Sequence, residues 1–126
     1  KRRKSATEIE SMTLIGEVEG KNILLVDDLT ETAGTLTTAA SLLKQKGART
    51  IRACVSHALL NPLGVERLRK SAIDELITTD SVPHPDIEGV KMTTLSVAGL
   101  LGEAIKRINS NSSVNSLFEF KGARTS

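Results

Sequence analysis

Short apolar runs alternate with segments of helical periodicity along most of the sequence, and this alternation restricts the possible folds strongly. Strands are expected at residues 12–18, 23–26, 50–55, 74–79 and 90–95, and helices at 35–46, 65–70 and 97–108. Strands separated by helices are joined by right-handed crossovers and form a parallel sheet. The sequence therefore predicts an α/β fold with a mostly parallel β-sheet flanked by helices. The continuous apolar run at 23–26 is typical of a strand that is covered on both faces.

Composition narrows the classes of protein that remain. Aromatic residues make up only 2% of the chain, so the core has to be built from aliphatic side chains. The formal net charge of +2 is too balanced to indicate a nucleic-acid partner. No apolar run approaches the roughly 20 residues of a membrane span. The single cysteine, Cys54, cannot form an internal disulfide, which favours a reducing compartment such as the cytoplasm.

Two carboxylates, Asp27 and Asp28, follow the apolar run, and a hydroxyl-rich loop with one glycine follows them. Residues 32–35 are expected at the start of a helix, where free backbone N–H groups and the helix dipole favour an anion. Carboxylates suit hydroxyl groups or a hydrated Mg²⁺ rather than the phosphate itself. The stretch fits a pentose 5-phosphate. In the plainer interpretation, Asp27 is a turn residue and Thr32 a helix cap.

The stretch LVDDLTETAGTL resembles the phosphoribosyl-diphosphate loop of the type I phosphoribosyltransferase fold. Four further segments resemble, in the same order, the C-terminal half of the ribose-phosphate pyrophosphokinase family: KRRKSATEIESMTLIGEVEGKNILLVDD, SHALLN, ELITTDSVP and SVNSLF. The resemblance implies that residues 1–126 are a C-terminal phosphoribosyltransferase-like domain that lacks the preceding N-terminal part of the family.

The resemblance also implies an activity, which is transfer of diphosphate from ATP to ribose 5-phosphate with Mg²⁺. Lys1 and Arg3 would be catalytic cations of a flexible loop, because fixed cations oppose charge on transferring phosphates. Asp27 and Asp28 would face the ribose hydroxyls and the metal. The 5-phosphate loop would comprise Glu31, Thr32, Ala33, Gly34 and Thr35. Homo-oligomers, often hexamers, are expected, and a fragment without the rest of the ATP site should turn over little substrate.

Glu31 departs from the family pattern, which commonly has Asp at this position, and Thr30 stands where an apolar residue is usual. One added methylene can shift a carboxylate by about 1 Å, and misplacement on that scale can be costly to catalysis. Two alternatives therefore stay open. One is a non-catalytic regulatory subunit that assembles with a synthase, and the other is a phosphoribosyltransferase that consumes the product.

Overall fold

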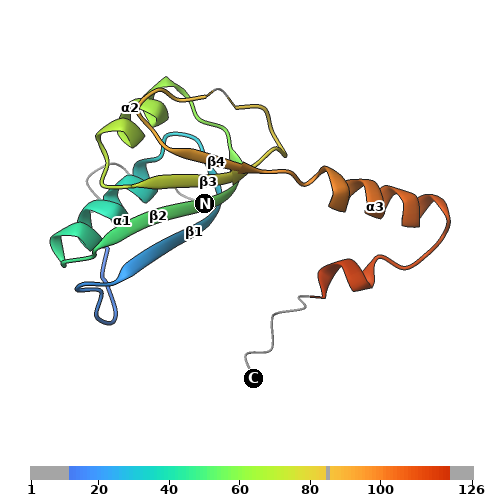
Figure 1. Cartoon of the computed structure of the whole chain (residues 1–126), viewed down its shortest axis with the longest axis horizontal. Coiled ribbons are helices and arrows are strands. Elements are labelled where there is room, and N and C mark those ends of the chain that lie inside the picture. The colour runs from blue at the N-terminus through green and yellow to red at the C-terminus, as the bar shows by residue number, and fades with distance from the viewer. Residues whose placement is uncertain (1–11, 85, 120–126) are drawn as a thin grey trace. The chain divides into compact units, whose positions relative to one another are not determined.

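The protein is described by a computed structural model in which residues 12–84 and 86–119 are placed (Figure 1). In chain order the elements are β1 (Asn22–Thr30), α1 (Gly34–Gln45), β2 (Thr50–Ala58), α2 (Pro62–Lys70), β3 (Glu75–Thr79), β4 (Met92–Leu95), α3 (Ala98–Asn109) and the 3₁₀ helix η2 (Asn115–Phe118). The chain divides into two compact units, one ending at Leu95 and the other beginning at Ser96. Within the described ranges no helix is long and apolar enough to cross a membrane.

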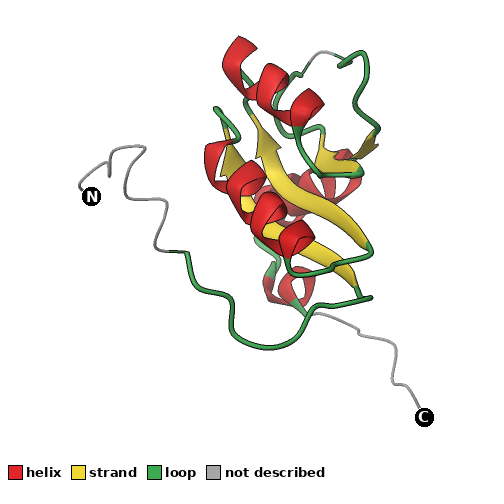
Figure 2. Cartoon of the chain, turned by 90° about the vertical axis from the view of Figure 1, so that its left-hand side faces the viewer, coloured by secondary structure: helices red, strands yellow, loops and turns green. Residues whose placement is uncertain are grey.

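The four strands of the first unit form one parallel sheet in the order β1-β2-β3-β4. The ladder between β1 and β2 runs from the pair Asn22–Thr50 to the pair Thr30–Ala58. Because each strand lies beside its predecessor and points the same way, right-handed crossovers place successive helices on one face of the sheet. Figures 1 and 2 show α1 and α2 on the same face. The predicted α/β fold with a parallel sheet is confirmed.

The core lies between the sheet and these two helices. Side chains at alternate positions of β2, Ile51, Ala53 and Val55, are at most 1% exposed. They pack against the inner faces of α1 and α2, which contribute Leu36, Ala40, Leu43 and Leu68. As the composition predicts, the described core contains aliphatic side chains and no aromatic ring.

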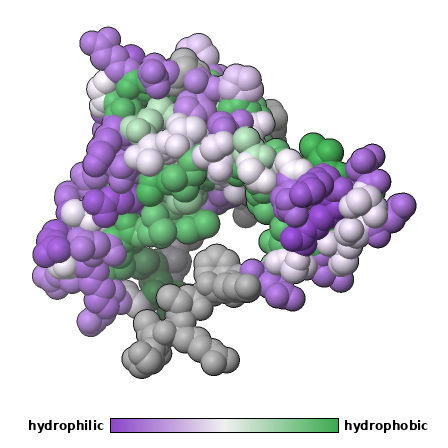
Figure 3. Space-filling model, turned by 45° about the vertical axis from the view of Figure 1, so that its right-hand side comes forward, coloured by the Kyte–Doolittle hydropathy of each residue, from purple (hydrophilic) through white to green (hydrophobic). Residues whose placement is uncertain are grey.

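The opposite face of the sheet is open at β1. Leu24 and Val26 are 56% and 74% exposed, whereas Ile23 and Leu25 on the other face pack against the core. Figure 3 shows apolar side chains gathered at the surface of the molecule. The prediction that residues 23–26 are covered on both faces is wrong in the described part of the chain. A run of consecutive apolar residues is typical of a strand that is buried on both faces, but here every second side chain, that of Leu24 and that of Val26, faces solvent.

The segment 12–18 forms no strand, contrary to the sequence-based prediction. Gly16 has a φ of 101°, which breaks an extended conformation. Ile15, the residue before it, is 93% exposed and lies outside the core. The apparent alternation in this segment therefore does not reflect sheet pairing.

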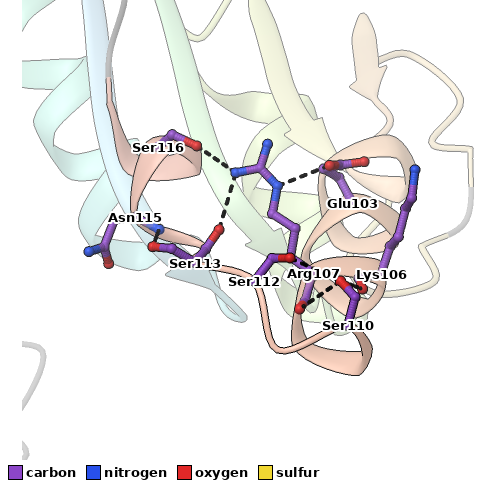
Figure 4. Close-up of polar contacts among 8 residues, drawn as sticks. All are labelled: Glu103, Lys106, Arg107, Ser110, Ser112, Ser113, Asn115 and Ser116. Atoms are coloured by element: carbon purple, nitrogen blue, oxygen red, sulfur yellow. Dashed lines mark hydrogen bonds and ion pairs between the residues drawn. The ribbon is translucent and has the colours of Figure 1, made fainter.

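The second unit contains α3 and η2, and Arg107 connects the two (Figure 4). Its Nε donates to Glu103 Oε1 at 2.9 Å within α3. Its Nη1 donates to the carbonyl oxygen of Ser113 and to Ser116 Oγ, at the start of η2. The predicted helix is confirmed, but its apolar residues are exposed: Leu100, Leu101, Ile105 and Ile108.

A polar cluster on the sheet joins three strands through Glu75 of β3. Its carboxylate accepts a hydrogen bond from Thr93 Oγ1 at 2.8 Å and pairs with Arg52 at 3.1 Å and Lys91 at 3.5 Å. The Thr93 hydrogen bond, with the charges of Lys91 and Arg52, holds the pKa of Glu75 below its ordinary value, against the opposing effect of burial. A carboxylate with a depressed pKa stabilises the fold at pH values above its unfolded-state pKa, and this contribution is lost as the pH falls through the folded-state pKa.

We predict that Glu75→Gln lowers the free energy of unfolding at pH 7, and that the difference from the wild type shrinks as the pH falls below about 4.5, the ordinary value. Urea unfolding followed by circular dichroism between pH 3 and 7 measures it. Glu88→Gln, at an exposed position in the loop before β4, is the matched control. A Glu75→Gln deficit that persists undiminished at pH 3 would contradict the assignment to the ionised carboxylate.

Candidate functional site

A hollow of about 420 Å³ lies at the carboxyl end of β1. In the described part of the chain, its lining comes from Asp27 and the continuous segment 29–36. The volume lies in the range of small-molecule sites, which occur at the carboxyl ends of strands in α/β folds. The lining contains hydroxyl, carboxylate and backbone groups and no cation.

The backbone between β1 and α1 turns sharply at Ala33. Ala33 has φ 55° and ψ 16°, a left-handed conformation that costs a residue other than glycine about 1–2 kcal/mol. Ala33 is only 3% exposed, and its carbonyl oxygen accepts from Thr37 Oγ1 at 2.7 Å and from the Thr37 N–H at 3.0 Å. No side chain caps α1 at its start. A left-handed residue followed by helical ones turns successive N–H groups toward one concavity, which is the geometry of an anion-binding nest.

The two aspartates, which the sequence analysis placed at the end of the strand, lie within β1, and the strand continues to Thr30. Consecutive side chains of a strand point to opposite faces. Asp27 lines the hollow, and Asp28 is exposed and does not. Asp27 Oδ1 accepts a hydrogen bond from the N–H of Asp28 at 2.8 Å, which fixes the orientation of the Asp27 carboxylate.

Of the predicted site residues, the structure brings Asp27 together with the five proposed phosphate-loop residues: Glu31, Thr32, Ala33, Gly34 and Thr35. It does not bring Asp28 into the lining. Lys1 and Arg3 lie outside the described residues. Within the described ranges, no group of three or more His, Cys, Asp or Glu side chains is placed to hold a metal ion.

Residues at the start of α2 and within it donate hydrogen bonds to the backbone of the loop between β1 and α1. These contacts were not predicted from the sequence. The N–H of Asn61 donates to the carbonyl oxygen of Glu31 at 3.1 Å, and a Cβ added at Gly64 would overlap that same oxygen. Arg67 Nη1 donates to the carbonyl oxygen of Thr32 at 3.1 Å.

The sequence predicts a helix at residues 65–70, but α2 begins three residues earlier, at Pro62. The Asn61 cap, which accepts from the Gly64 N–H, and a proline at the first position were available as start signals.

The polar ends of β2 and β3 meet beside each other, as the parallel sheet predicts. His57 Nδ1 and Ser81 Oγ are 2.7 Å apart, and Thr79 Oγ1 donates to the carbonyl oxygen of Ser56 at 2.7 Å. The register pairs His57 with Leu29, which lines the hollow. The three strand ends therefore share one edge of the sheet.

Comparison with known proteins identifies the family. Residues 3–119 match the family described as the phosphoribosyl synthetase-associated domain. The chain belongs to this family. It is 46% identical over 120 residues to a ribose-phosphate pyrophosphokinase of Oceanobacillus iheyensis, a match that covers 94% of this chain and 38% of that protein. A ribose-phosphate pyrophosphokinase of Helicobacter hepaticus is also 46% identical, over 122 residues, with the same two shares.

The solved structures support the same family. The fold matches a phosphoribosylpyrophosphate synthetase from Mycobacterium smegmatis with a TM-score of 0.73 and 32% sequence identity. That match covers 78% of this chain and 33% of the solved one. The chain thus spans little more than a third of the length of the curated relatives that it matches.

We predict that Ala33→Val destabilises the protein by about 2 kcal/mol, because a β-branched side chain tolerates the left-handed conformation of this residue poorly. Ala33→Gly is the matched control. Glycine adopts this conformation without strain but gives up a buried methyl group, so its change should stay within about 1 kcal/mol. Urea unfolding measures both. Equal stability of the two variants would show that Ala33 is not left-handed in solution.

Proposed function

We propose that the chain is the C-terminal, phosphoribosyltransferase-like domain of a longer ribose-phosphate pyrophosphokinase, and that it supplies the ribose 5-phosphate site of that cytoplasmic enzyme. The enzyme would transfer diphosphate from ATP to the 1-hydroxyl of ribose 5-phosphate, giving 5-phosphoribosyl 1-diphosphate and AMP. The assignment to the C-terminal half rests on the resemblance of the segments quoted above. The names of the relatives support the activity.

One observation carries the proposal. The lining of a single hollow includes both the Asp27 carboxylate and the uncapped start of α1. The free N–H groups at a helix start favour a phosphate, whereas a carboxylate accepts hydrogen bonds from hydroxyl groups and repels phosphate. These two features of the lining therefore suit the phosphate and the hydroxyl groups of one sugar phosphate. Thr32 and Thr35 add hydroxyl donors at the phosphate end.

Mg²⁺ fits this arrangement as an ion shared with the substrate. Magnesium is usually held by one or two carboxylates together with substrate oxygens and waters, so it does not need a cage of protein ligands. Asp27, which lines the hollow, would hold the ion, and the ion would neutralise charge on the transferring phosphates when bound. Asp28, the other predicted metal ligand, does not line the hollow.

Lys1 and Arg3 are proposed as the cations that stabilise the transferring phosphates. Most of the ATP site, and the neighbouring subunit that would complete it in a homo-oligomer, lie beyond this chain. On this account the isolated chain binds ribose 5-phosphate and turns over little or no ATP. Neither nucleic acid nor a membrane is a proposed partner.

We predict that the 126-residue chain binds ribose 5-phosphate with a Kd of about 1 mM or tighter, and that Asp27→Asn weakens this binding roughly tenfold. Binding of inorganic phosphate should be unchanged in the variant, because Asp27 addresses the hydroxyl end of the ligand. Titration calorimetry with and without Mg²⁺ measures both ligands.

Asp86→Asn, at an exposed position in the loop before β4, is the control and should bind both ligands like the wild type. Two results would count against the proposal. One is no binding of ribose 5-phosphate at millimolar concentration. The other is an equal loss of both ligands in Asp27→Asn, which would mean that the carboxylate acts only on the loop conformation.

The departure at Glu31 distinguishes an enzyme from a regulatory subunit. Its backbone carbonyl accepts a hydrogen bond from the N–H of Asn61, and its side chain is exposed, so we expect the extra methylene to act on the position of the carboxylate. We predict that a full-length protein releases AMP from ATP and ribose 5-phosphate, and that Glu31→Asp changes the rate less than tenfold. If the wild-type full-length protein releases no AMP and its Glu31→Asp variant does, the result would support the regulatory alternative. Consumption of phosphoribosyl diphosphate without AMP release would support a phosphoribosyltransferase.

A further inference from the structure

Arg67 is an exposed residue of α2 whose guanidinium donates a hydrogen bond to the loop between β1 and α1. Its Nη1 lies 3.1 Å from the carbonyl oxygen of Thr32, a residue 35 positions earlier in the chain. Within the described residues, no carboxylate forms an ion pair with it, unlike its neighbour Arg69, which lies 3.8 Å from Glu66. The positive charge of Arg67 is therefore directed at the backbone of the loop.

The guanidinium of Arg67 lies close to the backbone of Gly34. A Cβ at position 34 would lie 3.1 Å from Arg67 Nη1, a distance at which one of the two groups has to give way. Gly34 is the first residue of α1 and does not have a positive φ, so its backbone conformation alone does not require glycine. The missing side chain instead leaves room for Arg67 beside the uncapped helix start.

The contact involves the peptide unit that carries the N–H of Ala33, a residue that lines the hollow. The Thr32 carbonyl and the Ala33 N–H belong to the same peptide unit. A hydrogen bond donated to a carbonyl polarises its peptide and makes the N–H of that unit a stronger donor. The guanidinium also holds this peptide in place next to the left-handed Ala33, whose conformation persists only when its surroundings fix it.

We propose that Arg67 is a positioning residue of the phosphate loop. It fixes the Thr32–Ala33 peptide, strengthens the Ala33 N–H as a donor to the phosphate, and supplies from α2 the positive charge that the described lining of the hollow lacks. This role rests on the proposed function, because it assumes that the loop binds the 5-phosphate of the sugar. It differs from a direct ligand role, since the side chain acts through the backbone of the loop.

The test compares Arg67→Ala with Arg69→Ala in the 126-residue chain. Arg69 is on the same helix and its Nε also donates to a backbone carbonyl, that of Glu88, at 2.9 Å, so it matches Arg67 in chemistry but not in place. Calorimetry gives the affinities for ribose 5-phosphate and for inorganic phosphate. Amide chemical shifts of the unliganded proteins report on the Ala33 N–H, and unfolding curves confirm that both variants fold.

We expect Arg67→Ala to weaken both ligands by a similar factor, about tenfold, which corresponds to about 1.4 kcal/mol. Its Ala33 amide proton should move upfield without ligand, as expected for a weaker donor. Arg67→Lys, which keeps the charge, should recover part of the affinity. Arg69→Ala should bind both ligands within twofold of the wild type and leave the Ala33 amide unmoved.

Wild-type affinity in Arg67→Ala, or an unmoved Ala33 amide, would overturn the inference. Equal losses in Arg67→Ala and Arg69→Ala would also overturn it, because a general effect of charge on α2 would then explain the binding. If the wild type binds inorganic phosphate but not ribose 5-phosphate, the proposed function fails by itself. The role of Arg67 is then decided by its effect on inorganic phosphate and on the Ala33 amide.

Discussion

The parallel ladder between β1 and β2 is the constraint on which the site depends. It extends to the pair Thr30–Ala58 and continues beyond the strands, where the N–H of Leu59 donates to the carbonyl oxygen of Thr30 at 2.9 Å. The next hydrogen bond, from the N–H of Asn61 to the carbonyl oxygen of Glu31, places the start of α2 next to the loop between β1 and α1. A shift of this register by one residue would move the α2 contacts off the loop and turn the core side chains of β2 to the other face.

The loop is consequently held from two directions. The Thr37 hydroxyl in the first turn of α1 donates to the carbonyl oxygen of Ala33, and Arg67 of α2 donates to that of Thr32. These contacts offset the cost of a left-handed residue other than glycine at the centre of the loop. Such preorganisation suits an anion site, because donors that are already oriented lose little entropy when the ligand binds.

Sequence reasoning predicted the parts of the fold that depend on local pattern. The α/β class and the order of the elements from β1 to α3 follow from periodicity, and the extent of α1 follows from periodicity and from the lysine and glycine near the end of this helix. The hydroxyl-rich segment was correctly placed before a helix, because its residue types are typical of helix starts, and its phosphate-binding role stays a prediction. The segment 12–18 and the length of β1 were wrong, since strand pairing depends on a partner that is distant in the sequence. The exposure of Leu24 and Val26 could not be predicted, because a run of apolar residues does not say which faces are covered. The Arg67 contact gave no sequence signal either, since its partner is a backbone carbonyl.

The central claim is that one hollow receives both ends of a sugar phosphate, and a crystal structure of the chain with ribose 5-phosphate tests it most directly. The account predicts the phosphate at the N–H groups of residues 33–35, with a sugar hydroxyl within hydrogen-bonding distance, about 2.5–3.0 Å, of the Asp27 carboxylate. A ligand bound with the phosphate away from the start of α1, or bound elsewhere with the loop unchanged, would contradict it.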